Sequence, residues 1–137
     1  MSDLSQVAAN VAVSSGASTE LVQYGEAVTQ GQPLYKSTVD GKYSQCDAND
    51  TAAKAVCAAI ALTPGATDGY GVIAKPGSLV NLGATLAVGQ SYGISATKGA
   101  INLTSDLASG SFSTVIGIAT TTALLKFVPL VSGVQKP

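Results

Sequence analysis

The chain has 137 residues, a length that predicts one domain whose core is large enough to fold without a disulfide or a metal. Its seven basic residues are lysines scattered singly, it has no histidine, and its net charge is −1. We therefore expect neither a nucleic-acid surface nor a histidine-dependent catalytic or metal site. Only 11% of the residues are charged, against about 25% in an ordinary domain, which indicates that much of the surface lies against other protein.

No segment has the length and apolar character of a membrane span. The most apolar stretch, residues 55–62, has eight residues and is mostly alanine, whereas a spanning helix needs about 18–20 apolar residues. The first six residues lack the positive start and apolar run of a secretory signal. The sequence predicts a soluble protein that is made in the cytoplasm and has no membrane partner.

Residues 1–24 differ from the rest of the chain in composition and periodicity, and they predict an irregular N-terminal arm. They are rich in Ser, Ala, Gln and Val and show no clear period. One interpretation is a floppy terminus. The other is an arm that becomes ordered on a partner, whose contacts are supplied by Leu4, Val7, Val11 and Val13. On this second interpretation, deleting residues 2–20 leaves the rest of the chain folded but weakens attachment.

From residue 25 onward the chain consists of short β-type segments separated by turns. Asp40 and Gly41 predict a two-residue hairpin turn between strands at 33–38 and 42–46. A loop at 63–69 precedes a strand over 70–74. Residues 80–88 alternate with period two, which predicts one half-buried strand or two strands that meet at residue 83.

An internal repeat relates two parts of this region. When the chain is shifted by 58 residues, positions 27–63 fall on 85–121 with seven identities and no gap. The repeat pairs Gly31-Gln32 with Gly89-Gln90 and Gly41 with Gly99, and it pairs residues 54–62 with a β-branched stretch that contains Gly117. This favours strand over helix for 54–62.

We therefore predict an all-β fold, a small antiparallel barrel or sandwich built from two sequence-related halves, with an irregular N-terminal arm. The arm covers residues 1–24 and a single β domain covers 25–137, with halves at about 27–80 and 85–137. One half alone would leave an apolar face uncovered, and two halves cover each other.

The polar residues do not suggest catalysis. Cys46 and Cys57 are interpreted as two reduced, partly buried thiols, with a disulfide and a two-ligand metal site as weaker alternatives. The pair Asp47 and Asp50 resembles a fragment of a calcium loop, but the glycine and the distal glutamate of such a loop are missing, so a solvated turn is favoured. Five tyrosines could form a sugar-binding platform, although two of them align with aliphatic residues of the other half. We expect no enzyme activity, no cofactor and no metal.

The order and spacing of several short motifs resemble the capsid decoration (head cement) proteins of tailed bacteriophages. The motifs are Ala27-Val28-Thr29-Gln30-Gly31-Gln32-Pro33-Leu34-Tyr35, Ala58-Ala59-Ile60-Ala61-Leu62-Thr63, Gly69-Tyr70, Gly89-Gln90 and Val115-Ile116-Gly117-Ile118-Ala119. The likeness covers about residues 25–131, and it departs from the family at Ala59, where glycine is usual. The arm before Tyr24 has no counterpart in the resemblance.

The resemblance implies a structural protein on the exterior of a phage head that bridges major capsid subunits and stabilises the expanded shell. It also implies a homo-oligomer, a dimer or a trimer, with the major capsid protein shell as its partner. The low charge and the abundance of small residues agree with wide, flat protein contacts. Two alternatives stay open at this point: another virion component, such as a tail or adhesion module, and a small carbohydrate-binding β domain.

Overall fold

The computed structural model describes residues 3–13 and 17–137, and it confirms the all-β class. Within these ranges two antiparallel sheets account for every strand, and the helical elements are three single 3-10 turns, at Ala8–Asn10, Ala53–Ala55 and Thr104–Asp106. The six-stranded sheet contains β1 (Val11–Val13), β7 (Leu79–Leu82), β8 (Ser91–Ile94), β9 (Ile101–Leu103), β10 (Phe112–Ala119) and β11 (Leu124–Gln135). The five-stranded sheet contains β2 (Thr19–Gln23), β3 (Pro33–Lys36), β4 (Tyr43–Gln45), β5 (Ala59–Ala61) and β6 (Tyr70–Ala74).

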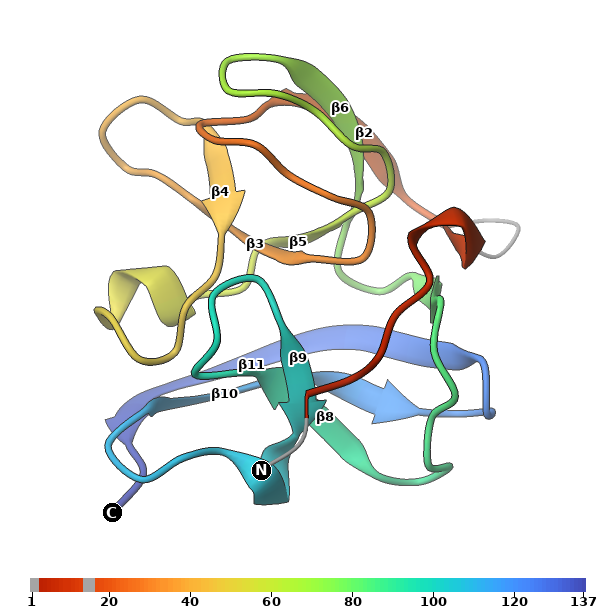
Figure 1. The fold of residues 1–137 in the computed structure, drawn as a ribbon, viewed down its shortest axis with the longest axis vertical. Coiled ribbons are helices and arrows are strands. Elements are labelled where there is room, and N and C mark those ends of the chain that lie inside the picture. The colour runs from red at the N-terminus through yellow and green to blue at the C-terminus, as the bar shows by residue number, and fades with distance from the viewer. Residues whose placement is uncertain (1–2, 14–16) are drawn as a thin grey trace.

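The two sheets form two layers, with β2–β6 above and β8–β11 below in Figure 1. The larger buried cluster draws on both layers, since Cys46, Cys57 and Ile60 pack in it with Ile116 and Phe127. A second cluster, around Tyr24 and Leu34, lies within the five-stranded sheet. Apolar residues of both sheets therefore pack together in the larger cluster, while the smaller cluster belongs to the five-stranded sheet.

The two sheets repeat the same strand order. The five-stranded order is β2-β6-β5-β3-β4, and the six-stranded order is β7-β11-β10-β8-β9 with β1 added outside β7. The pairing of β3 with β4 and with β5 recurs, 58 residues later, as the pairing of β8 with β9 and with β10. For example, Leu34 pairs with Gln45 and Ala59, and Tyr92 pairs with Leu103 and Gly117.

The turns that precede β3 and β8 also match. Gly31 and Gly89 have φ angles of +87° and +83°, a backbone region that glycine adopts without steric cost. Their N–H groups donate to the carbonyl oxygens of Ala61 and Ala119, each at 2.8 Å. Those two alanines in turn donate to the carbonyl oxygens of Gln32 and Gln90, each at 3.0 Å. The glycine–glutamine pairs thus hold each hairpin against the neighbouring strand of its sheet.

The Asp40-Gly41 hairpin joins β3 to β4, but its loop is longer than the predicted two residues. Ser37 and Lys42 close the loop through a hydrogen bond of 2.9 Å, which leaves four residues between them. Gly41 has a φ of +73°, and Gly99 in the β8–β9 hairpin has a φ of +76°. The Asp40 carboxylate accepts a hydrogen bond from the Lys42 N–H, and this bond is the main reason that the pKa of Asp40 lies below its usual range.

The prediction of an irregular arm over residues 1–24 is wrong, because two strands lie within it. β1 extends the six-stranded sheet beside β7, and β2 extends the five-stranded sheet beside β6. Tyr24 is fully buried. The segment looks irregular in sequence because each strand is short. The serines and alanines around the two strands also interrupt the alternation of apolar and polar residues that would reveal them.

Two predicted strands are shorter than expected. The alternation over 80–88 yields only β7, since Gly83 takes a φ of +73° and turns the chain away from the sheet. The stretch 54–62 begins as a 3-10 turn, and only β5 within it is strand. Ala55 at the end of that turn is buried, and its carbonyl oxygen accepts a hydrogen bond of 2.6 Å from the Thr114 hydroxyl. This bond fixes the turn against β10.

The chain passes from one sheet to the other at an earlier residue than the expected halves, 27–80 and 85–137, imply. β7 begins at Leu79 and belongs to the six-stranded sheet, and β2 lies before residue 27 and belongs to the five-stranded one. The repeated strand order therefore covers residues 19–74 and 79–135. The expected division missed β2 because its partner strand is distant in sequence: Gln23, for example, pairs with Tyr70 of β6.

Candidate interaction surfaces

The acidic side chains of the suspected calcium loop are engaged in structural contacts. Asp47 accepts a hydrogen bond from the Asn49 N–H at 2.9 Å, and Asp50 forms an ion pair with Lys54 at 2.7 Å, as a solvated turn would. Within residues 3–13 and 17–137, no group of three His, Cys, Asp or Glu side chains is placed to hold a metal ion. In the same ranges, no helix has the length and apolarity to cross a membrane.

Cys46 and Cys57 are free and buried, in agreement with two reduced thiols. Burial, followed by a hydrogen bond with Cys57, raises the pKa of the Cys46 thiol well above its usual range. A thiol held in its neutral form is a poor nucleophile and a poor metal ligand. This pair therefore serves to fill the core.

The tyrosines do not gather into a platform. Tyr24, Tyr43 and Tyr92 are buried, and the hydroxyl of Tyr24 donates to the carbonyl oxygen of Thr63 at 2.8 Å. Burial raises the pKa of Tyr24. Tyr70, at the start of β6, is 67% exposed, and it pairs with Gln23 next to the buried Tyr24. Three of the five rings are thus used in packing.

The outer face of the β10–β11 hairpin carries a continuous apolar surface. We call it the hairpin face, and it consists of Val115, Ile118, Val128 and Leu130. Val115 is paired directly with Leu130, and Ile118 with Lys126, so these side chains share one side of the sheet. Ile118 and Val128 are each 51% exposed, and Leu130 is 70% exposed.

The hairpin face surrounds a shallow apolar hollow of about 530 Å³, bordered by Thr120, Lys126 and Pro129. The opposite side of the same two strands carries Thr114, Ile116 and Phe127, all buried in the core. The hairpin is therefore apolar on both sides, although only one side is covered. An exposed cluster of large apolar side chains is typical of a surface that contacts another protein.

The length of β11 explains this exposure. β7 pairs with β11 only over Leu124–Lys126, so from Val128 onward the strand is supported by β10 alone. Val131 and Val134 are also exposed there. The register with β10 shifts once before Leu130 and again after Val131, and Gly133 has a φ of +71°. From Val128 onward, β10 is thus the strand partner of β11 within the described residues, and the outer side chains of β11 stay exposed.

The four residues expected to form a contact arm differ in how far they are buried. Val11 is buried in β1, and Leu4 and Val13 pack against the core of this same chain. Of the four, only Val7 is largely exposed, at 55%. The N-terminal segment is therefore an integral part of the fold, and three of the four predicted contact residues are used internally.

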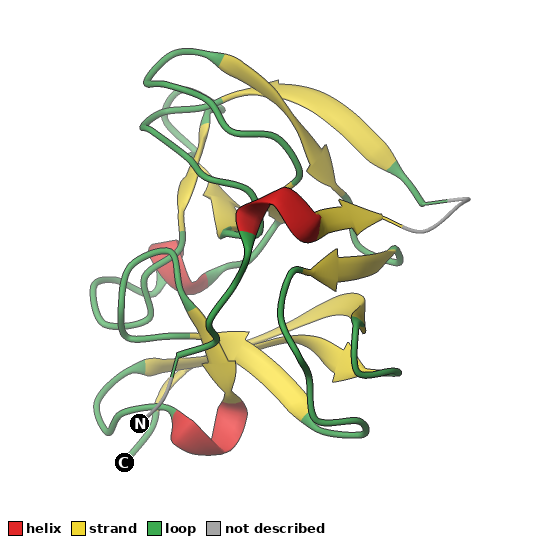
Figure 2. Cartoon of the chain, turned by 45° about the vertical axis from the view of Figure 1, so that its right-hand side comes forward, coloured by secondary structure: helices red, strands yellow, loops and turns green. Residues whose placement is uncertain are grey.

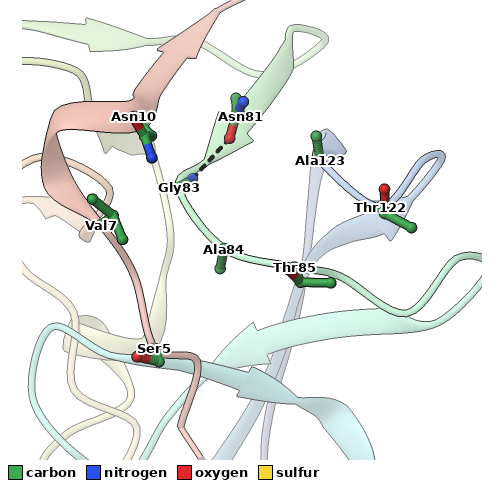
Figure 3. A pocket seen from close by; sticks show the side chains of 9 residues that line it. All are labelled: Ser5, Val7, Asn10, Asn81, Gly83, Ala84, Thr85, Thr122 and Ala123. Atoms are coloured by element: carbon green, nitrogen blue, oxygen red, sulfur yellow. Dashed lines mark hydrogen bonds between the residues drawn. The ribbon is translucent and has the colours of Figure 1, made fainter.

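Val7 lies beside a polar hollow of about 540 Å³ between the N-terminal segment, the loop after β7 and the β10–β11 turn (Figure 3). The polar residues of its lining are uncharged, and they are Ser5, Asn10, Asn81, Thr85 and Thr122. The Val7 N–H donates to the carbonyl oxygen of Gly83 at 2.7 Å, and a Cβ on Gly83 would overlap the Val7 carbonyl oxygen. The lining of this hollow therefore offers hydrogen-bond donors and acceptors but no charge.

The remaining turn and repeat residues serve the fold. Gly31, Gln32, Gly89 and Gln90 hold the equivalent turns described above, and Asp40, Gly41 and Gly99 form the hairpin loops. Gly117 lies in β10, where a Cβ would overlap the carbonyl oxygen of Lys126 on β11.

Sequence reasoning missed the hairpin face. The apolar residues of 124–134 resemble any buried strand, because composition and alternation do not show that β7 stops short of them. A signal was present in Pro129 and Gly133, which are unusual in the interior of a covered strand.

Comparison with known protein families, with curated proteins and with solved structures finds no match to this chain.

Proposed function

We propose that this protein is a capsid decoration protein that binds the outer surface of a phage head and stabilises the expanded shell by bridging major capsid subunits. The proposal combines the resemblance of the motifs between residues 25 and 131 with one structural observation, the exposed hairpin face. This face offers an apolar contact area, and its border carries one charged residue, Lys126. Such a surface suits a shell partner better than a small ligand or a nucleic acid.

In this proposal the two sheets are the layers of a small sandwich or barrel that arose by duplication of one five-stranded unit. The matched strand order and the 58-residue shift in register support a common origin of the two halves.

Stabilisation follows from mass action. A protein that binds the expanded shell but not its unexpanded precursor lowers the free energy of the expanded state at each occupied site, and the effect is multiplied over many sites. No catalytic step, cofactor, nucleic acid or membrane is involved. The protein would be made in the host cytoplasm and act on the capsid exterior as a homo-oligomer.

The test is the substitution Leu130→Asp at the centre of the hairpin face. Leu130 is 70% exposed, so the variant should keep the stability of the wild type within about 0.5 kcal/mol. Its affinity for decoration-free expanded heads should fall by about tenfold or more, since a buried carboxylate would replace an apolar contact. Co-sedimentation of heads with increasing protein measures this affinity.

The matched control is Val39→Asp, which adds the same charge at a site that is 94% exposed in the β3–β4 loop. It should bind heads like the wild type. If Leu130→Asp also binds like the wild type, the hairpin face is not the shell contact and the proposal loses its main structural support.

A further inference from the structure

The outer edge of β2 is a regular strand edge that no described segment covers. The edge of β4 is covered at Tyr43, whose carbonyl oxygen accepts a hydrogen bond from Gly25. The edge of β9 is covered at Ile101, whose carbonyl oxygen accepts one from Leu4. Uncovered edges are usually short, bulged or interrupted by proline, since they otherwise pair with other chains.

The other free edges have such protection, and β2 does not. β1 has only three residues, and the outer part of β11 contains Pro129 and two bulges. β2 has five residues, pairs with β6 without a bulge, and contains neither proline nor glycine. At its centre Leu21 is 67% exposed, and Tyr70 on the neighbouring strand β6 is equally exposed.

The equivalent edge in the other sheet is occupied. The strand order places β2 where β7 lies in the six-stranded sheet, and β7 has β1 paired along its outer side. Leu21 pairs with Val72 of β6, and Asn81 pairs with Leu124 of β11. The registers of the two sheets make these pairs equivalent, so Leu21 corresponds to Asn81. Ala12 of β1 pairs with Asn81. A five-stranded unit of this type can therefore accept a sixth strand at this edge.

The direction of the main-chain groups of β2 follows from its bonds to β6. Lys75 donates to the carbonyl oxygen of Ser18 at 2.9 Å, and Tyr24 donates to that of Gly69 at 2.8 Å. In an antiparallel pair every second residue faces the partner strand, so residues 18, 20, 22 and 24 face β6. The outward N–H and C=O groups, which no described residue pairs with, are those of Thr19, Leu21 and Gln23.

We propose that a second copy of this chain pairs with this edge, β2 against β2, antiparallel and centred on Leu21. This register sets Leu21 opposite Leu21 of the second copy, and Thr19 opposite Gln23. The three outward N–H groups of each copy then each meet a carbonyl oxygen of the other.

Charge and strand length select this register. Glu20 lies opposite Val22 of the second copy, whereas a shift of the centre to residue 20 would set the two Glu20 side chains against each other. Like charges directly opposite destabilise a strand pair, and apolar pairs stabilise it. A shift of the centre to residue 22 would carry Thr19 beyond the end of the partner strand, since β2 ends at Gln23.

The sequence of β2 is thus complementary to itself when Leu21 is the centre, which favours a second copy over an unrelated strand. The pairing gives a surface to the self-association expected of the proposed function, but it does not depend on binding to a capsid.

The first test is Leu21→Pro, measured as molar mass by sedimentation equilibrium over a range of concentrations without phage heads. The wild type should show a concentration-dependent dimer with twice the 13.5 kDa of one chain. Proline removes the outward N–H of Leu21 but no hydrogen bond to β6. The dissociation constant of the dimer should therefore rise about tenfold or more. A wild type that stays monomeric, or a variant that dimerises as well as the wild type, would overturn the proposal.

The second test examines the register of the strand pair. It also tests the proposal if the proline variant does not fold. Thr19→Lys with Gln23→Lys sets like charges opposite each other in the dimer, and Thr19→Glu with Gln23→Lys sets opposite charges there. The first double variant should be monomeric at concentrations where the second is dimeric. Equal dimerisation of the two would contradict the pairing. Because heads are absent from both tests, their failure leaves the capsid proposal to be judged by the hairpin-face variants alone.

Discussion

Gly117 and Ala59 occupy equivalent positions in the two sheets, and only one of them requires glycine. Both are paired across the sheet with a residue of a hairpin strand, Tyr92 and Leu34 respectively. A Cβ on Gly117 would overlap the carbonyl oxygen of Lys126 on β11, whereas the Cβ of Ala59 packs in the smaller core cluster. Alanine is thus accommodated at position 59 for a local steric reason, whereas position 117 requires glycine.

We predict that Gly117→Ala destabilises the protein by about 1–3 kcal/mol, since the clash is with main chain that cannot rotate away. The reverse exchange in the other sheet, Ala59→Gly, should cost about 1–2 kcal/mol, from added backbone freedom and the loss of one buried methyl group. Urea unfolding of both variants measures the difference. A Gly117→Ala variant as stable as the wild type would contradict this account of β10.

At the scale of elements, a single side chain links the N-terminal segment to both sheets. The side-chain amide of Gln6 donates to the carbonyl oxygen of Gly31 at 3.1 Å and to that of Leu82 at 2.9 Å. Gly31 precedes β3 in one sheet and Leu82 ends β7 in the other. The segment therefore crosses between the layers, as Figure 2 shows for the helical turn at Ala8–Asn10.

Gln6→Ala should lower the free energy of unfolding by about 1–2 kcal/mol, because two partly buried carbonyl groups lose their donor. Gln135→Ala is the matched control, since the Gln135 side chain makes one exposed hydrogen bond, of 3.0 Å, to the carbonyl oxygen of Gly110 in the loop before β10. It should change stability by no more than about 0.5 kcal/mol. Thermal unfolding followed by circular dichroism measures both, and similar losses in the two variants would contradict a linking role for Gln6.

The sequence predicted those elements whose signal is local. The hairpin at Asp40-Gly41 and the strand over 70–74 follow from residues that favour one backbone conformation. The extent of β5 and β7 did not follow, because it depends on contacts with distant residues such as Thr114 and Val7. The hairpin face was missed for the same reason, since the exposure of Leu130 depends on where β7 ends.

At the scale of the whole molecule, the N-terminal segment completes the fold. β1 and β2 together extend both sheets, and Tyr24 fills the smaller core cluster. The deletion of residues 2–20 removes β1 and the first part of β2, and it exposes apolar surface on both sheets. We therefore no longer expect that these residues can be removed without loss of the fold.

We predict that the chain without residues 2–20 unfolds at a clearly lower temperature than the full chain, or does not fold at all. Its amide protons in β6 and β7, the neighbours of the deleted strands, should exchange fastest. Hydrogen exchange of the full and shortened chains measures this. A shortened chain with unchanged melting temperature and protection would show that the segment is dispensable.

The central proposal is that this protein binds an expanded phage head, and its most direct test is co-sedimentation with phage heads taken from the source of this sequence. The purified full chain is mixed with decoration-free expanded heads, with unexpanded proheads, and with unrelated beads of similar size. The account predicts saturable binding to expanded heads alone, at a fixed ratio to the major capsid subunit. Binding no greater than to the beads would contradict it and would favour a tail or adhesion module with the same β fold.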